Sequence, residues 1–424
     1  MNISLPYGTR QVSFNVPDGV FTRMYDPVAC APAADFDAEI VQAIDNPVGS
    51  PDFDDIVRNA KKINIIADDM TRPTPVNRIL PILAGRLAKV GVKDEQIKII
   101  IALGSHRYMT EDELRERVGD AIYKRYKVEN SEFRAETGLV FAGKTPEDAD
   151  IFISKNALDA DCKIGIGNFA PHPVMGWSGG GKIIYPGVAG EGTVAYFHLK
   201  ASLYDENLFG KDTTPVREMM EGWVDAVGLN FIINTVLTPD FKLHRAVAGH
   251  YKAAYKAGVD IAKSVLGCKV DEKADVAVVS SHPADQDFWQ SPKGMYGAEP
   301  ALKGETGGTI ILVSPNYEGV GNHPEFLEWM GRDDGDAYIK GIFAGQPYTG
   351  DPLAIAVGNS MSKMRRRRRL VVVSDGVSAR EMDRCGCIRY PMCDLQKCID
   401  AEIKRYADCR LAAVTNGAET VLYN

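Results

Sequence analysis

Apolar runs separated by amphipathic segments follow one another through the first half of the chain. Three runs predict buried strands, because they are uninterrupted or alternate with period two. Between them lie segments with helical periodicity, one with Thr74 as a cap and Pro75 in the first turn, another opening with a capping box at Thr110. Strands that alternate with helices predict parallel βαβ units. The strand segments are 62–69, 96–102 and 163–168; the helical ones are 35–44, 75–90 and 192–199.

The pattern restarts after residue 272 with a fresh apolar run, so the chain is predicted to hold two α/β domains. We expect parallel-type sheets flanked by helices in both. The predicted domains are residues 1–266 and 273–411, and the tail 412–424 returns to the first if it adds a strand there. Further elements are expected as a hairpin at 230–248, a helix at 251–266, strands at 273–281, 309–314 and 370–374, and helices at 325–330, 352–361 and 394–406.

Composition narrows the function without deciding it. The chain is 45% apolar and 25% charged, with a net charge of −8, which argues against a general binder of nucleic acid or anionic membranes. The N-terminus alternates like a hairpin and lacks the apolar core of a signal peptide, so a cytoplasmic protein is expected. The cysteines at 385, 387, 393 and 398 do not have a standard metal-site spacing. The arginine run 365–369 is predicted to be a solvated helix end.

Polar residues gather where predicted strands end. In parallel sheets, ligands bind at the carboxyl ends of the strands. Three such loops, 68–75, 104–107 and 171–182, therefore make a coherent candidate site.

The loop from Gly176 to Lys182 matches the first part of a phosphate-binding loop. It departs at Ile183, where a hydroxyl would hold magnesium, so a nucleoside triphosphatase is disfavoured. A magnesium-free phosphate cradle remains open, as does a plain glycine-rich turn with an exposed lysine. The lysine itself is either an anion clamp or a covalent anchor.

Two further groups of residues suit an anionic ligand. Asp69, Thr71 and Arg72 lie between a strand and a helix, where an arginine reads a carboxylate or phosphate; the simpler alternative is an Asp cap beside a surface arginine. In the second half, Gln290 and Lys293 are three residues apart and suit one helical face that binds a carboxylate, or else a solvated helix start.

Three of the seven histidines fall beside these loops, at His106, His172 and His198. A lone histidine is more often structural, but this grouping favours a function. His282 and His323 have no such company and are expected to be structural.

Taken together, these stretches resemble the nickel-pincer-nucleotide lactate racemase family. The resemblance covers essentially the whole chain. It rests on Asp68-Asp-Met-Thr-Arg-Pro-Thr-Pro75, Gly104-Ser-His-Arg107, His172-Pro-Val-Met-Gly-Trp-Ser-Gly-Gly-Gly-Lys182, the histidine sixteen residues later, and Gln290-Ser-Pro-Lys293.

The resemblance implies two α/β domains with the active site in the cleft between them. It implies a nickel-pincer nucleotide (nickel pyridinium-3,5-bisthiocarboxylic acid mononucleotide) linked covalently through Lys182, with His198 as a nickel ligand. By the same resemblance, His106 and His172 are the acid/bases. The cofactor-binding residues are Asp69, Met70, Thr71, Arg72, Gly179, Gly180 and Lys182; the substrate-binding residues are Arg72, Trp289, Gln290 and Lys293.

The chemistry suits these residue types. Racemising a 2-hydroxy acid by hydride removal gives a planar 2-keto acid that is re-reduced on either face, and each enantiomer needs its own base for the hydroxyl proton. Proteins that build the cofactor are implied as partners. Trp289 stands where the lactate enzyme is expected to have tyrosine, and Trp177 lies in the site loop, so both are expected to shape the pocket. Larger substrates such as malate or a sugar acid therefore stay open, as does a nucleotide-binding protein without the pincer cofactor.

Overall fold

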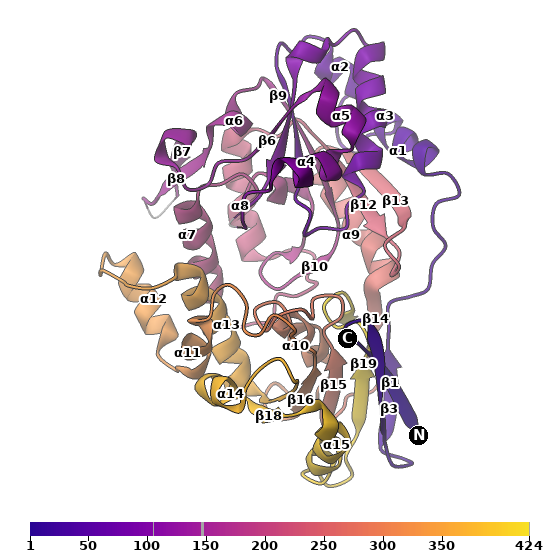
Figure 1. The fold of residues 1–424 in the computed structure, drawn as a ribbon, viewed down its shortest axis with the longest axis vertical. Helices are drawn as coiled ribbons and strands as arrows, with labels where there is room; N and C mark the ends of the chain where they lie inside the picture. Colours follow the sequence, from indigo (N-terminus) through magenta and orange to yellow (C-terminus); the bar gives the residue numbers. More distant parts are fainter. Residues whose placement is uncertain (105, 146–147, 424) are drawn as a thin grey trace.

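Two six-stranded sheets organise the chain, one in each half. The computed structural model describes residues 1–104, 106–145 and 148–423. Figure 1 shows the two halves stacked along the long axis of the molecule. Both sheets are mainly parallel and flanked by helices, which confirms the predicted α/β class.

The first sheet has the order β13-β12-β9-β4-β5-β6. All neighbours are parallel except the edge strand β13, which returns antiparallel from β12 as the predicted hairpin. The central strands are buried on both faces, which is why their sequences are almost uninterruptedly apolar. The strands are β4 (Ile63–Asp68), β5 (Ile97–Ala102), β6 (Lys127–Asn130), β9 (Cys162–Asn168), β12 (Phe231–Leu237) and β13 (Leu243–Gly249).

Helices cover both faces of this sheet, and each face has its own apolar cluster. Asp35 caps the first helix and the predicted capping box at Thr110 is present. One face carries α1 (Phe36–Asp45), α2 (Phe53–Val57), α3 (Val76–Lys89), α4 (Glu111–Val118) and α5 (Asp120–Arg125). The other carries α7 (Glu191–Ser202), α8 (Pro215–Val227) and α9 (Ala253–Leu266); α6 (Lys155–Leu158) and the hairpin of β7 (Leu139–Lys144) and β8 (Asp150–Ser154) lie beside them.

The second sheet is fully parallel, in the order β18-β17-β16-β15-β19-β3. Its strands are β3 (Phe21–Tyr25), β15 (Val276–Ser280), β16 (Thr309–Val313), β17 (Arg369–Val373), β18 (Ile388–Tyr390) and β19 (Leu411–Val414). One face packs on α10 (Pro292–Ala298), α11 (Phe326–Gly331), α13 (Pro352–Arg367) and α14 (Ala379–Cys385), with α12 (Gly335–Phe343) outside them. The other packs on α15 (Leu395–Ile403) and the hairpin of β1 (Asn2–Tyr7) and β2 (Arg10–Asn15).

The chain crosses between the halves more than once. Residues 1–25 pack with the second sheet, and Figure 1 shows the indigo N-terminal strands beside the yellow C-terminal ones. The tail divides between β19, inside the second sheet, and β20 (Val421–Tyr423), which pairs with β14 (Gly267–Lys269) in the connection between the halves. The domain boundary near residues 267–272 stays a prediction.

Loops at the carboxyl ends of both sheets meet at the junction of the halves. The short hairpin of β10 (Pro171–His172) and β11 (Gly176–Trp177) follows β9, and α10 follows β15; Figure 1 shows β10 and α10 facing each other there. Among the described residues, no helix combines the length and apolar character needed to span a bilayer.

Candidate active site

The turn after β4 is braced from α4. Arg117 pairs with the carboxylate of Asp68 and donates to the main-chain oxygens of Asp68, Arg72 and Thr74 at 2.9, 3.1 and 3.0 Å. The Thr74 hydroxyl donates to Asp68 at 2.6 Å. The prediction that Thr74 caps a helix was therefore wrong, because its hydroxyl is used by Asp68 and α3 begins after Pro75 without a side-chain cap.

Asp69 orients the first candidate base. Its carboxylate lies 2.6 Å from Nδ1 of His106, and its other oxygen accepts from the hydroxyl of Thr71 at 2.6 Å and from its N–H at 3.2 Å. Burial alone would raise the pKa of Asp69, but the bonds from His106 and Thr71 hold that pKa below its ordinary value. A carboxylate at Nδ1 requires a proton on Nδ1, so neutral His106 presents a free lone pair on Nε2. Ser105, in the same motif, lies outside the described residues.

His172 is held in the opposite tautomer. Its Nδ1 accepts from the main-chain N–H groups of Val174 and Met175, both at 3.2 Å. Burial lowers its pKa well below the ordinary value, and the charges of Lys182 and Lys293 lower it further. The ring is thus neutral and carries its proton on Nε2.

The glycine-rich loop is fixed by close packing. Gly179 and Gly180 have φ of +81° and +62°, and a Cβ at Gly180 would lie 3.1 Å from the Tyr251 oxygen. The N–H of Gly180 donates to Asn234 at 2.9 Å. A side chain at either position would press against this packing, so both positions beside Lys182 favour glycine.

Trp177 and Arg217 anchor the start of this loop. Arg217 donates to the main-chain oxygens of Met175 and Trp177 at 3.3 and 2.6 Å and stacks on Tyr255 at 3.6 Å. The Trp177 side chain is fully buried, and its Nε1–H donates to Gly210 at 3.0 Å. The expectation that Trp177 shapes the substrate pocket was wrong, because its ring is used to hold the loop.

Lys182 lies half-buried at the end of the loop, and its ammonium group has no hydrogen-bond partner among the described residues. Burial lowers its pKa well below the ordinary value, and the cations Arg72, Lys293 and Arg217 lower it further. These interactions show that the predicted residues of both halves converge. A lysine with a lowered pKa supplies the neutral amine that covalent attachment needs.

His198 on α7 has one ring nitrogen bonded and the other free among the described residues. Its Nδ1–H donates to the main-chain oxygen of Val194 at 2.8 Å, which leaves the lone pair on Nε2 free. Burial lowers its pKa to about 4, so the imidazole is neutral at neutral pH. Across residues 1–104, 106–145 and 148–423, no three His, Cys, Asp or Glu side chains group as a metal site, and this includes the cysteines near residue 390.

The second half contributes a lysine and an amide that touch. Nζ of Lys293 donates to the side-chain oxygen of Gln290 at 2.6 Å. The prediction that one helical face carries both residues was wrong, because Gln290 precedes α10, which begins at Pro292. The two side chains nevertheless meet. Burial lowers the pKa of Lys293 to about 7, and the charge of Arg72 acts in the same direction. The guanidinium group of Arg72 has no hydrogen bond or ion pair within the described part of the chain, and Met70 beside it is exposed.

Two residues that sequence reasoning did not select lie at the same junction. Glu419 follows β19, and burial raises its pKa to about 7 against the charges of His282 and Lys293. His323 follows β16, and its ring centroid lies 4.4 Å from that of Trp289. Both follow parallel strands of the second sheet. Because ligands bind at the carboxyl ends of such strands, the same reasoning applied to the second sheet would have found them.

Known proteins share this fold and much of this sequence. The family described as the lactate racemase N-terminal domain matches residues 7–209. The lactate racemase of Thermoanaerobacterium thermosaccharolyticum is 30% identical over 82% of each chain, and that of Lactiplantibacillus plantarum is 31% identical over 80% of each.

Solved structures agree on the architecture. The lactate racemase apoprotein from Thermoanaerobacterium thermosaccharolyticum superposes with a TM-score of 0.87, at 23% identity and full coverage of both chains. A Thermotoga maritima protein superposes with a TM-score of 0.66, at 17% identity, over 89% of this chain and all of its own. At these identities the likeness shows the fold.

Proposed function

The chain belongs to the lactate racemase family, and from this premise we propose that it racemises or epimerises a 2-hydroxy acid with a nickel-pincer nucleotide attached to Lys182. As a member, it is an isomerase. One observation carries the proposal of this cofactor. Lys182 and His198 both have a lowered pKa, which favours a neutral amine and a neutral imidazole, and cations without an acid partner in the described chain lie near them.

The residues present fit that cofactor. Lys182 offers an amine for a thioamide link, and His198 offers one imidazole nitrogen to nickel. Gly179 and Gly180 are proposed to lie beside the nucleotide. A site with one protein ligand suits a metal whose other ligands come from the nucleotide. Asp69, Met70, Thr71 and Arg72 are proposed to lie along the nucleotide. When bound, the cofactor supplies an electrophilic acceptor for the hydride on C2.

Cations from both halves are proposed to hold the substrate carboxylate. Arg72 and Lys293 lie close enough for each to lower the pKa of Lys182. Gln290 keeps the Lys293 ammonium oriented at 2.6 Å, and Trp289 lies next to it in the chain. A carboxylate held from two sides leaves only C2 free to become planar, which favours re-reduction on either face.

The two histidines are proposed to exchange the hydroxyl proton. His106, with a free lone pair on Nε2, takes the proton from one enantiomer as C2 is oxidised. His172 gives a proton to the keto oxygen as C2 is reduced, which requires that its ring first take up a second proton on Nδ1, because a neutral imidazole would be left as an imidazolate. In the opposite direction the roles reverse, so the His172 ring must release the N–H groups of Val174 and Met175.

The test is to produce the protein with and without the proteins that build the cofactor. We expect a covalent adduct on Lys182 and racemase activity only in the first case. Rapid mixing with each pure enantiomer then tests the bases: His106→Ala and His172→Ala should each lose about 100-fold or more in full turnover but retain oxidation of opposite enantiomers. A protein that binds nucleotide and never carries an adduct would be an anion-binding protein instead. Equal loss for both enantiomers in both variants would make the histidines structural.

A further inference from the structure

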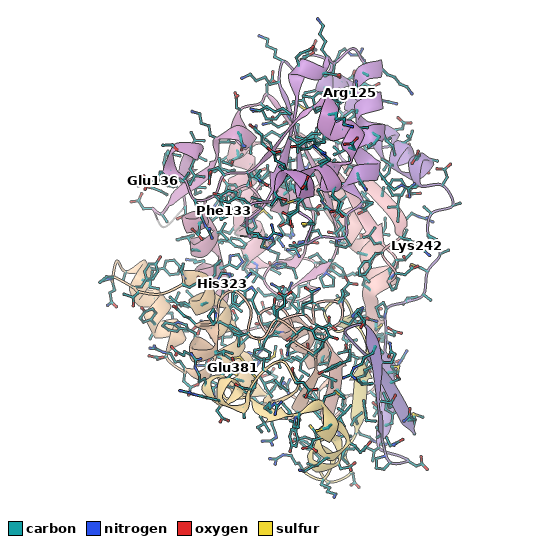
Figure 2. The ribbon with its side chains drawn as sticks, viewed as in Figure 1. Arg125, Phe133, Glu136, Lys242, His323 and Glu381 are labelled. Atoms are coloured by element: carbon teal, nitrogen blue, oxygen red, sulfur yellow. The ribbon has the colours of Figure 1, made fainter. Side chains whose placement is uncertain are left out.

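The loop between β16 and α11 carries an imidazole that the proposed reaction does not use. The His323 ring lies 4.4 Å from the Trp289 ring, with the planes tilted by 37°. Trp289 directly precedes Gln290, a proposed substrate ligand. Figure 2 shows His323 at the level where the two halves meet. The position is therefore on the substrate side of the second half.

Asp351 fixes this imidazole. Nδ1 of His323 makes a short hydrogen bond to the Asp351 carboxylate. The other Asp351 oxygen caps α13 through the N–H of Leu353 at 2.9 Å, and the Asp351 N–H donates to Glu325 at 3.0 Å. Burial alone would raise the pKa of Asp351, but the bond and charge of His323 lower that pKa, so Asp351 is ionised. The Nδ1 of His323 thus carries a proton, and its Nε2 has no partner within the described residues.

His323 and Asp351 lie close to residues of the first half of the molecule. The charge of His323 contributes to the low pKa of His198 on α7. Leu353 and Trp289, which flank the pair, pack with the apolar cluster of the first half that contains Tyr185. The His323 side chain is 23% exposed, so a small ligand has access to it.

We propose that His323, held by Asp351, binds a hydroxyl group on the substrate chain beyond C2. The substrate is then a 2-hydroxy acid with at least one more hydroxyl group, and this rests on the proposed function. A hydroxyl donates to a neutral Nε2 or accepts from a protonated one, so it satisfies the ring in either state. A second carboxylate would face the Asp351 charge, and a methyl group would cover Nε2 without a hydrogen bond.

Three substrates separate these possibilities in the cofactor-loaded enzyme. Lactate has a methyl group at C3, glycerate a hydroxymethyl group, and gluconate a longer polyhydroxy chain. We expect kcat/KM for the better polyhydroxy acid to exceed that for lactate by at least about tenfold, because lactate would cover the partly buried Nε2 of His323 without giving it a hydrogen bond. His323→Leu should lower this ratio about tenfold.

Two more variants make the test specific. Asp351→Asn keeps the shape and the helix cap but weakens the hold on the ring, so it should lower the ratio less than His323→Leu while remaining folded. His244→Leu changes a histidine whose Nδ1 bonds to Ala31 at 2.8 Å, away from the junction, and should leave the ratio unchanged. Melting temperatures of all variants show whether each is folded.

The outcomes distinguish the two proposals. If the loaded enzyme turns over lactate but prefers it to both polyhydroxy acids, or if folded His323→Leu and Asp351→Asn keep the wild-type ratio, the hydroxyl site is wrong and the proposed racemase stands. If protein with the adduct on Lys182 acts on malate and on none of the three acids, the hydroxyl site is wrong and the proposed racemase stands. If it acts on none of the four acids, the proposed function fails as well.

Discussion

Two groups of cations in this molecule have the same residue types and opposite surroundings. Arg72, Lys182 and Lys293 converge at the junction of the halves without an ion-pair partner in the described residues. The run from Arg365 to Arg369 is paired throughout its buried part. Arg365 bonds to Asp333 and to the Met330 oxygen, Arg367 and Arg368 bond to Glu299 at 3.1 and 3.3 Å, and Arg369 bonds to Glu402 at 2.9 and 3.0 Å.

The presence or absence of acid partners separates cations that stabilise the fold from cations that are available to bind an anion. The arginine run ends α13, as predicted. The prediction that this end is solvated was wrong, because Arg368 is buried and also donates to the oxygens of Lys303, Gly304 and Gly307. A buried cation with an acid partner ties segments together. Partly buried cations that have no acid partner repel each other until an anion binds. Arg72, Lys182 and Lys293 therefore lower the stability of the apo-protein.

The largest effect should come from removing the anchor. We expect Lys182→Met to carry no cofactor adduct and to lose at least about 1000-fold in racemase activity, because no other amine of the loop replaces it. Intact-protein mass and turnover measure both. Lys256→Met, which changes an exposed lysine of α9, is the control. An adduct of unchanged mass on Lys182→Met would show that the anchor lies elsewhere.

Removing an acid partner from the arginine run 365–369 should lower the stability of the protein and leave ligand binding unchanged. Glu299→Gln leaves Arg368 buried without its counter-charge, so we expect a loss of about 3 kcal/mol in the free energy of unfolding. Thermal and urea unfolding measure the loss. Glu305→Gln, an exposed acid nearby in sequence, should change nothing. If Glu299→Gln unfolds like the wild type, the arginine run does not stabilise the fold.

Removing a cation from the group of Arg72, Lys182 and Lys293 should raise the stability of the apo-protein instead of lowering it. Lys182 has a folded-state pKa below its unfolded value, so the unfolded chain binds more protons between the two values and the lysine destabilises the fold there. Lys182→Met should therefore raise the stability of apo-protein at pH 7 by about 1 kcal/mol. The gain should shrink toward the ordinary lysine pKa near 10.5.

Unfolding of apo-protein at pH 7 and pH 10 measures this difference. Lys256→Met again serves as the control, because this lysine is exposed and lies on α9. A Lys182→Met protein that is less stable than wild type at pH 7 would show that the lysine packs favourably and that the cations do not strain the fold.

Sequence predicted most of the frame because buried parallel strands have an unambiguous pattern. The runs at β4, β5, β9 and β15 are apolar on both faces, and their ends gave the candidate loops. Short edge strands such as β3 were missed, since a few half-buried residues have no clear period.

Less of the candidate site could be predicted from the sequence, for a different reason. The bonds that set the tautomers of His106 and His172 depend on loop geometry, and the pairing of Arg368 joins residues 69 positions apart. Local pattern carries no information about such partners. Sequence therefore identified which cations exist, and only the structure shows which of them have counter-charges.

The smallest predicted effect concerns Lys293 and pH. Its pKa of about 7 means that the ammonium loses its proton across the neutral range, and a neutral amine no longer attracts a carboxylate. We expect KM for the 2-hydroxy acid to rise about threefold or more from pH 6 to pH 8. Lys293→Arg keeps its charge, so its KM should be flat over that range.

Glu419 sharpens this test because its carboxylate supports the charge of Lys293. The pKa of Glu419 is about 7, raised by burial, and its negative charge raises the pKa of Lys293. Glu419→Gln should therefore move the rise in KM to lower pH, while kcat at pH 6 changes little. Racemisation rates over the pH series give both parameters. If Lys293→Arg keeps the wild-type slope, the pH dependence belongs to another group, and Lys293 would be a structural lysine like those that have acid partners.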